Sequence, residues 1–457
     1  MSSANQGRSQ QAQRSRRVLV VGAGFAGLAC GYELSNSGCN VHVLEARSRI
    51  GGRVDSRTDL IPGKVVEAGG EFLGANHPTA LRYIQKFGLR LLDAGDKRAE
   101  HPQPVVLNRH RLSESEIDAV DAETATAFGL LTELARTIDP QRPWSGAQAA
   151  SLDHTSLGDW LSTVDLSPLA KWIVEAYFTS TNSVSIHHQS LLGNLAQIHG
   201  GGLERYWTET EAFRLEGGNQ QLAIKLADAI GQERIQLNAP VARIQVLSDR
   251  VIVTEASSAR HVVDEVVLTV PPSLWSRIRI EPAIPSALHP QIGAAVKFLS
   301  VVNGRFWTQH GLPPAAFVFS NQSPAADVGE LWWGTEHQSG SSQEAMVGFV
   351  AGPAADYWIG QSTDSRNQAY ARQLQAVQPG FAAAVEEMQF IDWVNDPWSR
   401  GSYSFPAPGQ ITSQGPLLHN GLGRLRFAGE HACYPFVGYM EGALSSGASV
   451  AKRIVVE

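Results

Sequence analysis

The sequence predicts an α/β protein of two domains, one Rossmann-like and the other mixing a sheet with helices. Three observations predict this architecture. A strand, a glycine-rich turn, a helix and a second strand follow one another near the N-terminus. The length of 457 residues suits two large domains better than one. The middle of the chain has helical periodicity, and strand-like segments follow it.

The N-terminal segment predicts a βαβ unit. Residues 16–21 form a short β-branched run, and Gly22-Ala-Gly24-Phe-Ala-Gly27 follows at once. An apolar helical stretch extends from Leu28 to about Ser37, and a second strand covers Asn40–Leu44. Glu45 stands at the end of that strand. This order is typical of a dinucleotide-binding unit.

Each residue type has a physical role in such a unit. Gly22 permits the tight turn, Gly24 lets the backbone approach a pyrophosphate, and Gly27 lets the helix pack closely on the strand. The helix N-terminus offers unpaired N–H groups to the phosphates. Glu45 is placed to accept hydrogen bonds from the adenosine ribose diol.

The next segment favours FAD over NAD. Arg47 and the run Ile50-Gly-Gly52-Arg53 follow the acid directly. The glycines allow backbone close to a ligand, and Arg53 supplies a bidentate phosphate donor. An NAD enzyme does not need this second phosphate-binding turn. Another glycine pair follows in Glu67-Ala-Gly69-Gly70.

With these motifs the sequence resembles the flavin-containing amine oxidase family, which includes monoamine, polyamine and L-amino acid oxidases. The resemblance covers nearly the whole chain and implies that both domains are discontinuous. The FAD-binding domain is expected at 15–91, 210–299 and 390–457, and the substrate-binding domain at 92–209 and 300–389. Residues 1–14, rich in Ser, Gln and Arg, are expected to be a disordered tail.

Periodicity places further elements along the chain. Helices are expected at Glu114–Asp139, Ser156–Thr163, Leu166–Thr179 and Gln189–His199, and from Gly217 through Ile230. Strands are expected at Ile235–Leu237, Val241–Val246, Arg250–Glu255 and Val266–Val270.

The C-terminal segment resembles the family's second flavin motif. A short strand ends at Gly429-Glu430, and Gly438-Tyr439-Met440 leads into a helix of small residues that extends to about Ile454. The resemblance implies that Gly429-Glu430 contacts the FAD linker and that the backbone after Tyr439 contacts the ring. The helix N-terminus would stabilise negative charge on the reduced flavin.

The resemblance also implies the catalytic residues. Lys297 lies in an apolar run and matches the family lysine that holds a water at flavin N5. Tyr403 and Tyr439 match an aromatic cage that orients the amine. Ser402 stands where monoamine oxidases carry a flavin-bonded cysteine, so FAD is expected to be bound non-covalently.

The complete set of expected site residues follows from these motifs. The catalytic residues are Lys297, Tyr403 and Tyr439, and the substrate-binding residues are Phe72, Tyr403 and Tyr439. The FAD-binding residues are Gly22, Gly24, Phe25, Ala26, Gly27, Glu45, Ala46, Arg47, Gly52, Arg53, Gly69, Gly70, Glu71, Phe72, Val241, Trp398, Gly429, Glu430, Gly438, Tyr439 and Met440.

The reaction expected from this set is oxidative deamination of an amine. A hydride moves from the α-carbon to flavin N5, the imine is hydrolysed, and O2 or another acceptor reoxidises the flavin. A monoamine is favoured, because Phe72 stands where many L-amino acid oxidases carry a carboxylate-binding arginine. The alternatives are an L-amino acid oxidase, a flavin desaturase acting on isoprenoids and a flavoprotein without enzymatic activity.

Composition limits the partners. The net charge of -7 and the scattered basic residues give no reason to expect nucleic acid. Three cysteines make neither a metal-type spacing nor a disulfide framework, so no metal is expected. No signal peptide or apolar run of spanning length is present, so a soluble, cytoplasmic protein is expected, and a homodimer is compatible with it.

Overall fold

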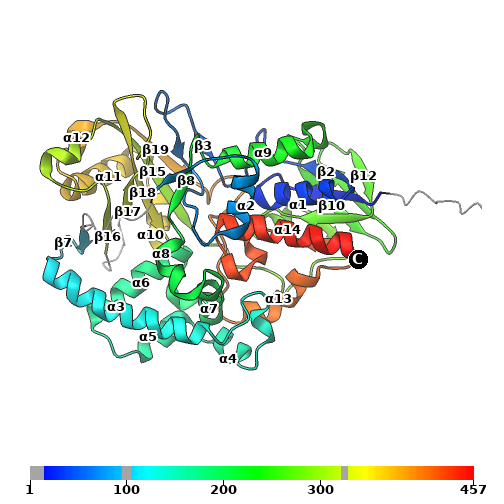
Figure 1. Ribbon diagram of the computed structural model, residues 1–457, viewed down its shortest axis with the longest axis horizontal. Helices are drawn as coiled ribbons and strands as arrows, with labels where there is room; N and C mark the ends of the chain where they lie inside the picture. Colours follow the sequence, from blue (N-terminus) through cyan, green and yellow to red (C-terminus); the bar gives the residue numbers. More distant parts are fainter. Residues whose placement is uncertain (1–14, 95–103, 321–327) are drawn as a thin grey trace, which may run out of the picture.

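The structure, a computed structural model, describes residues 15–94, 104–320 and 328–457. The expected tail at 1–14 lies outside these residues. Figure 1 shows three regions: a sheet flanked by α1 and α14, a second large sheet with α11 and α12 beside it, and a layer of helices from α3 to α7.

A five-stranded parallel sheet forms the nucleotide-binding region. Its strand order is β20-β13-β1-β2-β9. The bounds are β1 (Arg17–Val21), β2 (Asn40–Leu44), β9 (Ile235–Gln236), β13 (Glu265–Leu268) and β20 (Leu425–Phe427). The first and last parts of the chain therefore meet in one sheet, as the discontinuous domain requires.

Three helices pack with this sheet around one apolar core: α1 (Phe25–Asn36), α9 (Gln220–Ile230) and α14 (Met440–Val456). A separate four-stranded sheet has the order β12-β11-β10-β14, and its strands come from residues 241–281 of the chain. Its strands are β10 (Val241–Val246), β11 (Val251–Glu255), β12 (Arg260–Val263) and β14 (Arg279–Glu281).

A mixed seven-stranded sheet is the centre of the second region, with order β19-β15-β18-β17-β16-β6-β7. Its strands are β6 (Val105–Leu107), β7 (His110–Arg111), β15 (Ala295–Asn303), β16 (Ala316–Phe319), β17 (Gly329–Trp333), β18 (Gln343–Ala351) and β19 (Val385–Asp392). One face is covered by α10 (Pro353–Ile359), α11 (Thr363–Val377) and α12 (Phe381–Ala384), which share its core.

The helical layer has a core of its own. It contains α3 (Glu114–Ala135), α4 (Ala149–His154), α5 (Leu157–Thr163), α6 (Pro168–Asn182), α7 (Leu191–Gly200) and α8 (Tyr206–Glu209). The remaining α-helices and strands of the described residues are α2 (Pro78–Lys86), α13 (Gln410–Asn420) and the strand pairs β3 (Ser56–Arg57) with β4 (Val66–Glu67) and β5 (Leu91–Asp93) with β8 (Phe213–Leu215), and short 3-10 helices connect several elements.

Most expected elements occur, with shifted ends. β2 and β10 have the predicted bounds, whereas α3 ends at Ala135 rather than at Asp139. The domain division stays a prediction, and two of its edges, 299/300 and 389/390, fall inside β15 and β19. Among the described residues, no helix has the length and apolar character needed to cross a membrane.

The closest helix contact in the nucleotide-binding region joins α1 to α14. A Cβ added to Gly447 of α14 would lie 2.1 Å from the carbonyl oxygen of Ala26. That oxygen belongs to the backbone of α1, which cannot move without shifting the helix that follows the first glycine turn. The small residues of α14 thus set the distance between the two helices.

We expect Gly447→Ala to lower the melting temperature, because overpacking of this kind costs about 1–3 kcal/mol. Gly129→Ala is the matched control: Gly129 is exposed in α3 and its added Cβ would meet nothing within 4 Å. That control should be neutral or stabilising by roughly 0.5–1 kcal/mol, since alanine favours helix over glycine. Thermal unfolding of both variants tests the contact, and equal melting temperatures would contradict it.

Candidate active site

The site residues predicted from the sequence meet at one large cavity. It has a volume of about 1100 Å³ and is bounded by the five-stranded sheet, the seven-stranded sheet and helices α3 and α6. Every predicted site residue lines it except Gly27. A Cβ on Gly27 would lie 1.9 Å from the carbonyl oxygen of Gly22, so Gly27 serves packing, as its expected role requires.

Two glycine turns come together beside the five-stranded sheet. Gly24, directly before α1, forms a β-bridge with Gly51. A Cβ on Gly52 would come within 3.1 Å of the Gly24 Cα, so the two backbones meet only without side chains. The N-terminus of α1 opens onto the cavity at this point. The arrangement suits a pyrophosphate, which helix N-terminal N–H groups bind well.

Glu45 is fixed between these turns. It is buried at the end of β2, and its Oε2 accepts a hydrogen bond from the Ala23 N–H at 2.7 Å. Its Oε1 accepts another from the Arg47 N–H at 2.8 Å. The carboxylate therefore has a defined direction on the cavity wall, as a ribose-binding acid needs.

Arg47, expected among the FAD-binding residues, pairs with a carboxylate from a distant part of the chain. Its guanidinium makes two hydrogen bonds with Asp396, of 2.9 and 2.5 Å. Val241 and Trp398, both expected to bind FAD, line the same cavity. Their contacts with the cofactor stay predictions.

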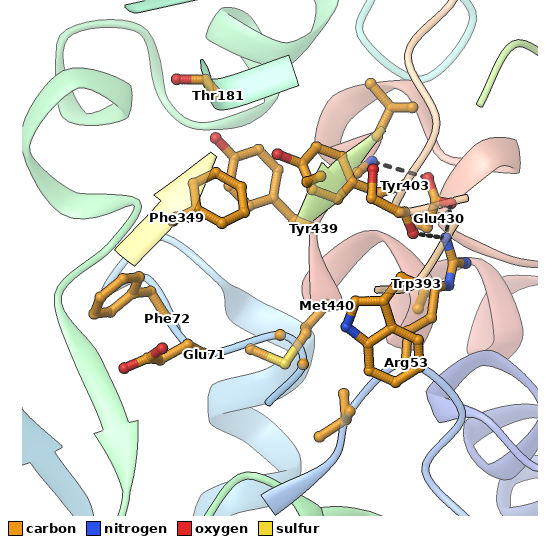
Figure 2. Close-up of a pocket in the computed structure, with 18 of the residues that line it drawn as sticks. Arg53, Glu71, Phe72, Thr181, Phe349, Trp393, Tyr403, Glu430, Tyr439 and Met440 are labelled. Carbon is orange, nitrogen blue, oxygen red and sulfur yellow. Dashed lines mark hydrogen bonds and ion pairs between the residues drawn. The ribbon is translucent and has the colours of Figure 1, made fainter. Parts of the chain in front are cut away.

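The partly exposed Arg53 and the buried Glu430 form an ion pair on the cavity wall, which Figure 2 shows together with Tyr403. Arg53 Nη1 lies 3.0 Å from Glu430 Oε1 and donates to the Ser402 carbonyl oxygen at 2.6 Å. Glu430 also accepts from the Ser404 N–H and hydroxyl and from the Gly438 N–H. Burial alone would raise the pKa of Glu430, but the Arg53 guanidinium holds it below the ordinary value.

The two predicted cage tyrosines lie on the same part of the cavity wall (Figure 2). The Tyr403 hydroxyl donates to the Ser180 carbonyl oxygen at 3.1 Å. Tyr439 interacts with the hydroxyl of Tyr206, which donates to Gln197 Oε1 at 3.0 Å. Burial raises the pKa of both Tyr403 and Tyr439 above the ordinary value, so both phenols stay neutral.

One row of the seven-stranded sheet forms another wall. Lys297 of β15 pairs with Phe349 of β18, which pairs with Glu330 of β17, which pairs with Phe317 of β16. Cross-strand neighbours share a face, and all four of these residues line the cavity. The sheet register thus places the predicted lysine and an acid on one surface.

Lys297 is buried and its ammonium is surrounded by protein acceptors. Nζ donates to the carbonyl oxygens of Glu67 at 3.1 Å and Gly69 at 2.9 Å, and to Glu71 Oε2 at 2.7 Å. Its expected role at flavin N5 stays a prediction.

Phe72, predicted to bind substrate and cofactor, packs against two residues that the sequence analysis did not identify. The Arg214 guanidinium lies 4.9 Å from the Phe72 ring centre, and the Trp332 ring centre lies 5.2 Å from it. Other cavity residues missed from the sequence include Tyr206, Glu211 and Glu330. One feature of the sequence could have indicated Glu330, because it is an acidic residue within the largely apolar segment that forms β17.

Together these features define a class of protein. A cradle of two glycine turns with a buried acid opens into the same cavity as the tyrosine pair, so a dinucleotide bound there would reach the tyrosines. This is the arrangement of a flavin-dependent oxidoreductase, and the residues present fit FAD.

Comparison with known proteins identifies the family. The family described as "Flavin containing amine oxidoreductase" matches residues 25–455, and the chain belongs to it. The protein is therefore an FAD-dependent enzyme that oxidatively deaminates amines.

Relatives and solved structures agree. A probable flavin-containing monoamine oxidase A of Dictyostelium discoideum is 26% identical over 96% of this chain and 97% of its own length. Human flavin-containing amine oxidase B is 25% identical over 96% of this chain and 86% of its own. Cyclohexylamine oxidase of Brevibacterium oxydans has the same fold, with a TM-score of 0.84 and 24% identity over 97% of this chain and 99% of its own.

We expect FAD to be released without covalent attachment. Ser402 is buried with its hydroxyl donating to Ser183 Oγ at 3.1 Å, and a hydroxyl cannot form the thioether that a cysteine would. Acid precipitation should leave the yellow colour in the supernatant. Flavin remaining with the pellet would contradict the expectation, and a covalent monoamine oxidase serves as the control.

Proposed function

We propose that the enzyme oxidises an amine that carries no obligatory carboxylate, favouring a monoamine, and that O2 is the acceptor, giving H2O2. The observation that carries the proposal is the charge of the cavity near the tyrosine pair. Glu211 and Glu330 line this part of the cavity, and Asp118 and Asp121 of α3 line another part of its wall. Negative charge at these places favours a cationic amine over a carboxylate.

The positive groups of the cavity support the same proposal. Among the described lining residues, the arginines are Arg47, Arg53 and Arg277. The first two pair with carboxylates, and Arg277 donates to the Pro397 carbonyl oxygen at 3.0 Å. Lys297 is held by Glu71. None of these described cations faces the acidic part as a free anchor for a substrate carboxylate, which an L-amino acid oxidase needs.

The chain's own residues supply position and a dry environment. Bound FAD supplies the hydride acceptor, and the substrate carbon must be aimed at it with the nitrogen lone pair free. The neutral Tyr403 and Tyr439 rings restrict the orientation of the amine and exclude water. Their raised pKa values mean that neither acts as a phenolate base. Burial favours the neutral amine, which is the form that loses hydride.

A cytoplasmic location and a homodimeric state, both expected or allowed by the sequence, stay proposals.

The substrate class is tested by comparing phenethylamine with phenylalanine in anaerobic stopped-flow reduction of the enzyme-bound flavin. We expect the amine to reduce the flavin faster by at least roughly tenfold, since burying an uncompensated carboxylate beside acids is costly. Reduction by the amino acid alone would contradict the proposal and favour the L-amino acid oxidase alternative.

The tyrosine pair is tested by Tyr439→Ala, which should slow flavin reduction roughly 10- to 100-fold by loosening the orientation of the amine. Tyr439→Phe is the matched control, because it keeps the ring and loses only the contact with Tyr206. In the unchanged enzyme the reduction rate should rise with pH, because the ammonium form must lose its proton before hydride can leave. A rate for Tyr439→Ala equal to that of Tyr439→Phe would show that the ring does not orient the substrate.

A further inference from the structure

The hydrogen bonds of Lys297 are complete. A lysine ammonium has three N–H donors, and the three acceptors around Nζ are the carbonyl oxygens of Glu67 and Gly69 and the carboxylate of Glu71. A fourth partner, such as a water, would have to displace one of them. A neutral amine has only two N–H donors, so this arrangement requires the charged form.

Glu71 is the centre of the cluster. Its Oε2 accepts from Lys297 at 2.7 Å, and its Oε1 accepts from Arg214 Nε at 2.9 Å and from Trp332 Nε1 at 2.8 Å. The side chains of Glu71, Lys297 and Arg214 are all nearly inaccessible to solvent. Two buried cations thus share the carboxylate of Glu71.

The backbone around Glu71 is fixed as well. Asn219 Nδ2 donates to the carbonyl oxygens of Gly70 at 3.0 Å and Glu71 at 2.6 Å. The Asn219 N–H donates to Glu67 Oε1 at 2.7 Å. Strands β4, β8, β15 and β17 therefore meet at one rigid point of the cavity wall.

We propose that Glu71 is a positioning residue, which fixes the Lys297 ammonium in a buried ion pair so that Lys297 acts as a permanent positive charge beside the flavin rather than as a mobile donor. The proposal rests on FAD occupying this cavity. A fixed cation on the wall stabilises the negative charge that a flavin gains on reduction, and Glu71 offsets part of that cation's field.

The charged groups that face Glu71 are consistent with this role. Burial alone would raise the pKa of Glu71, but Lys297 and Arg214 hold it below the ordinary value. Burial raises the pKa of the neighbouring Glu67 to about 7. The carboxylate of Glu71 therefore stays ionised, whereas the carboxyl group of Glu67 changes its protonation near neutral pH.

The test uses the FAD-loaded enzyme with Glu71→Gln and two electrostatic measurements: the flavin reduction potential and the affinity of the flavin for sulfite, which forms an anionic adduct. Loss of the carboxylate leaves more positive charge on the wall. We expect sulfite affinity to rise about tenfold and the potential to rise by about 30 mV, the two-electron equivalent of tenfold.

Two variants serve as controls. Glu71→Asp keeps the charge and should keep the potential. Glu344→Gln removes the carboxylate of a comparable buried pair, Lys64 with Glu344 at 2.8 Å, which does not line the cavity. It should leave both measurements unchanged. Equal shifts in Glu344→Gln and Glu71→Gln, or no shift in Glu71→Gln, would overturn the proposal.

Two complications have defined outcomes: a Glu71→Gln variant that does not fold, and an enzyme that binds no FAD. If Glu71→Gln does not fold, Lys297→Met is measured in its place, because it removes the cation and leaves Glu71 paired with Arg214. Sulfite affinity and the reduction potential should then fall, and unchanged values would overturn the proposal. An unchanged enzyme that binds no FAD would instead refute the cofactor, which is a separate result.

Discussion

The ion pair between Arg53 and Glu430 is the interaction on which the active site depends. It joins the second glycine turn, near the start of the chain, to the segment after β20, near its end. Arg53 also holds the carbonyl oxygen of Ser402, and Glu430 holds the N–H groups of Ser404 and Gly438. These three residues are the chain neighbours of Tyr403 and Tyr439, so one ion pair positions both tyrosines. Loss of Arg53 would leave the buried Glu430 carboxylate without its cation, which is more costly than the loss of an exposed pair.

Charge divides the cavity into two parts with different chemistry. Near the glycine turns the lining cations Arg47 and Arg53 are paired with carboxylates, so the expected dinucleotide would depend largely on backbone N–H groups and on Glu45. Near the tyrosines, Glu211 and Glu330 line the cavity, and the described cations Lys297 and Arg214 are held by Glu71. Under the proposed function, these acids attract a cationic amine, and the charge of Lys297 stabilises the reduced flavin.

Local sequence patterns predicted much of the fold. The bounds of β2 and β10 follow from short apolar runs with clear breakers, and the glycine turns follow from spacing alone. All predicted site residues but Gly27 line the cavity because the motifs are short and contiguous. The partners of those residues were not predictable, because Arg214, Trp332 and Glu330 lie far from Glu71 and Lys297 in sequence. The register of β15, β17 and β18 brings Glu330 and Trp332 to Lys297, and register depends on the whole sheet. Arg214 comes from β8, in a different sheet.

The close contact of α14 with α1 has a consequence for synthesis. The nucleotide-binding sheet contains β1 and β2 from the start of the chain and β20 from near its end, and α14 covers α1. On the ribosome, the first βαβ unit therefore emerges long before the strand and helix that complete its core. α9 can cover part of α1 once residue 230 is translated, but the face that contacts α14 stays uncovered until residues 440–456 follow. The cavity residues from Gly429 to Ala443 also come last, so the expected cofactor site is completed only near the end of synthesis, and a chaperone that shields the early unit would act during that interval.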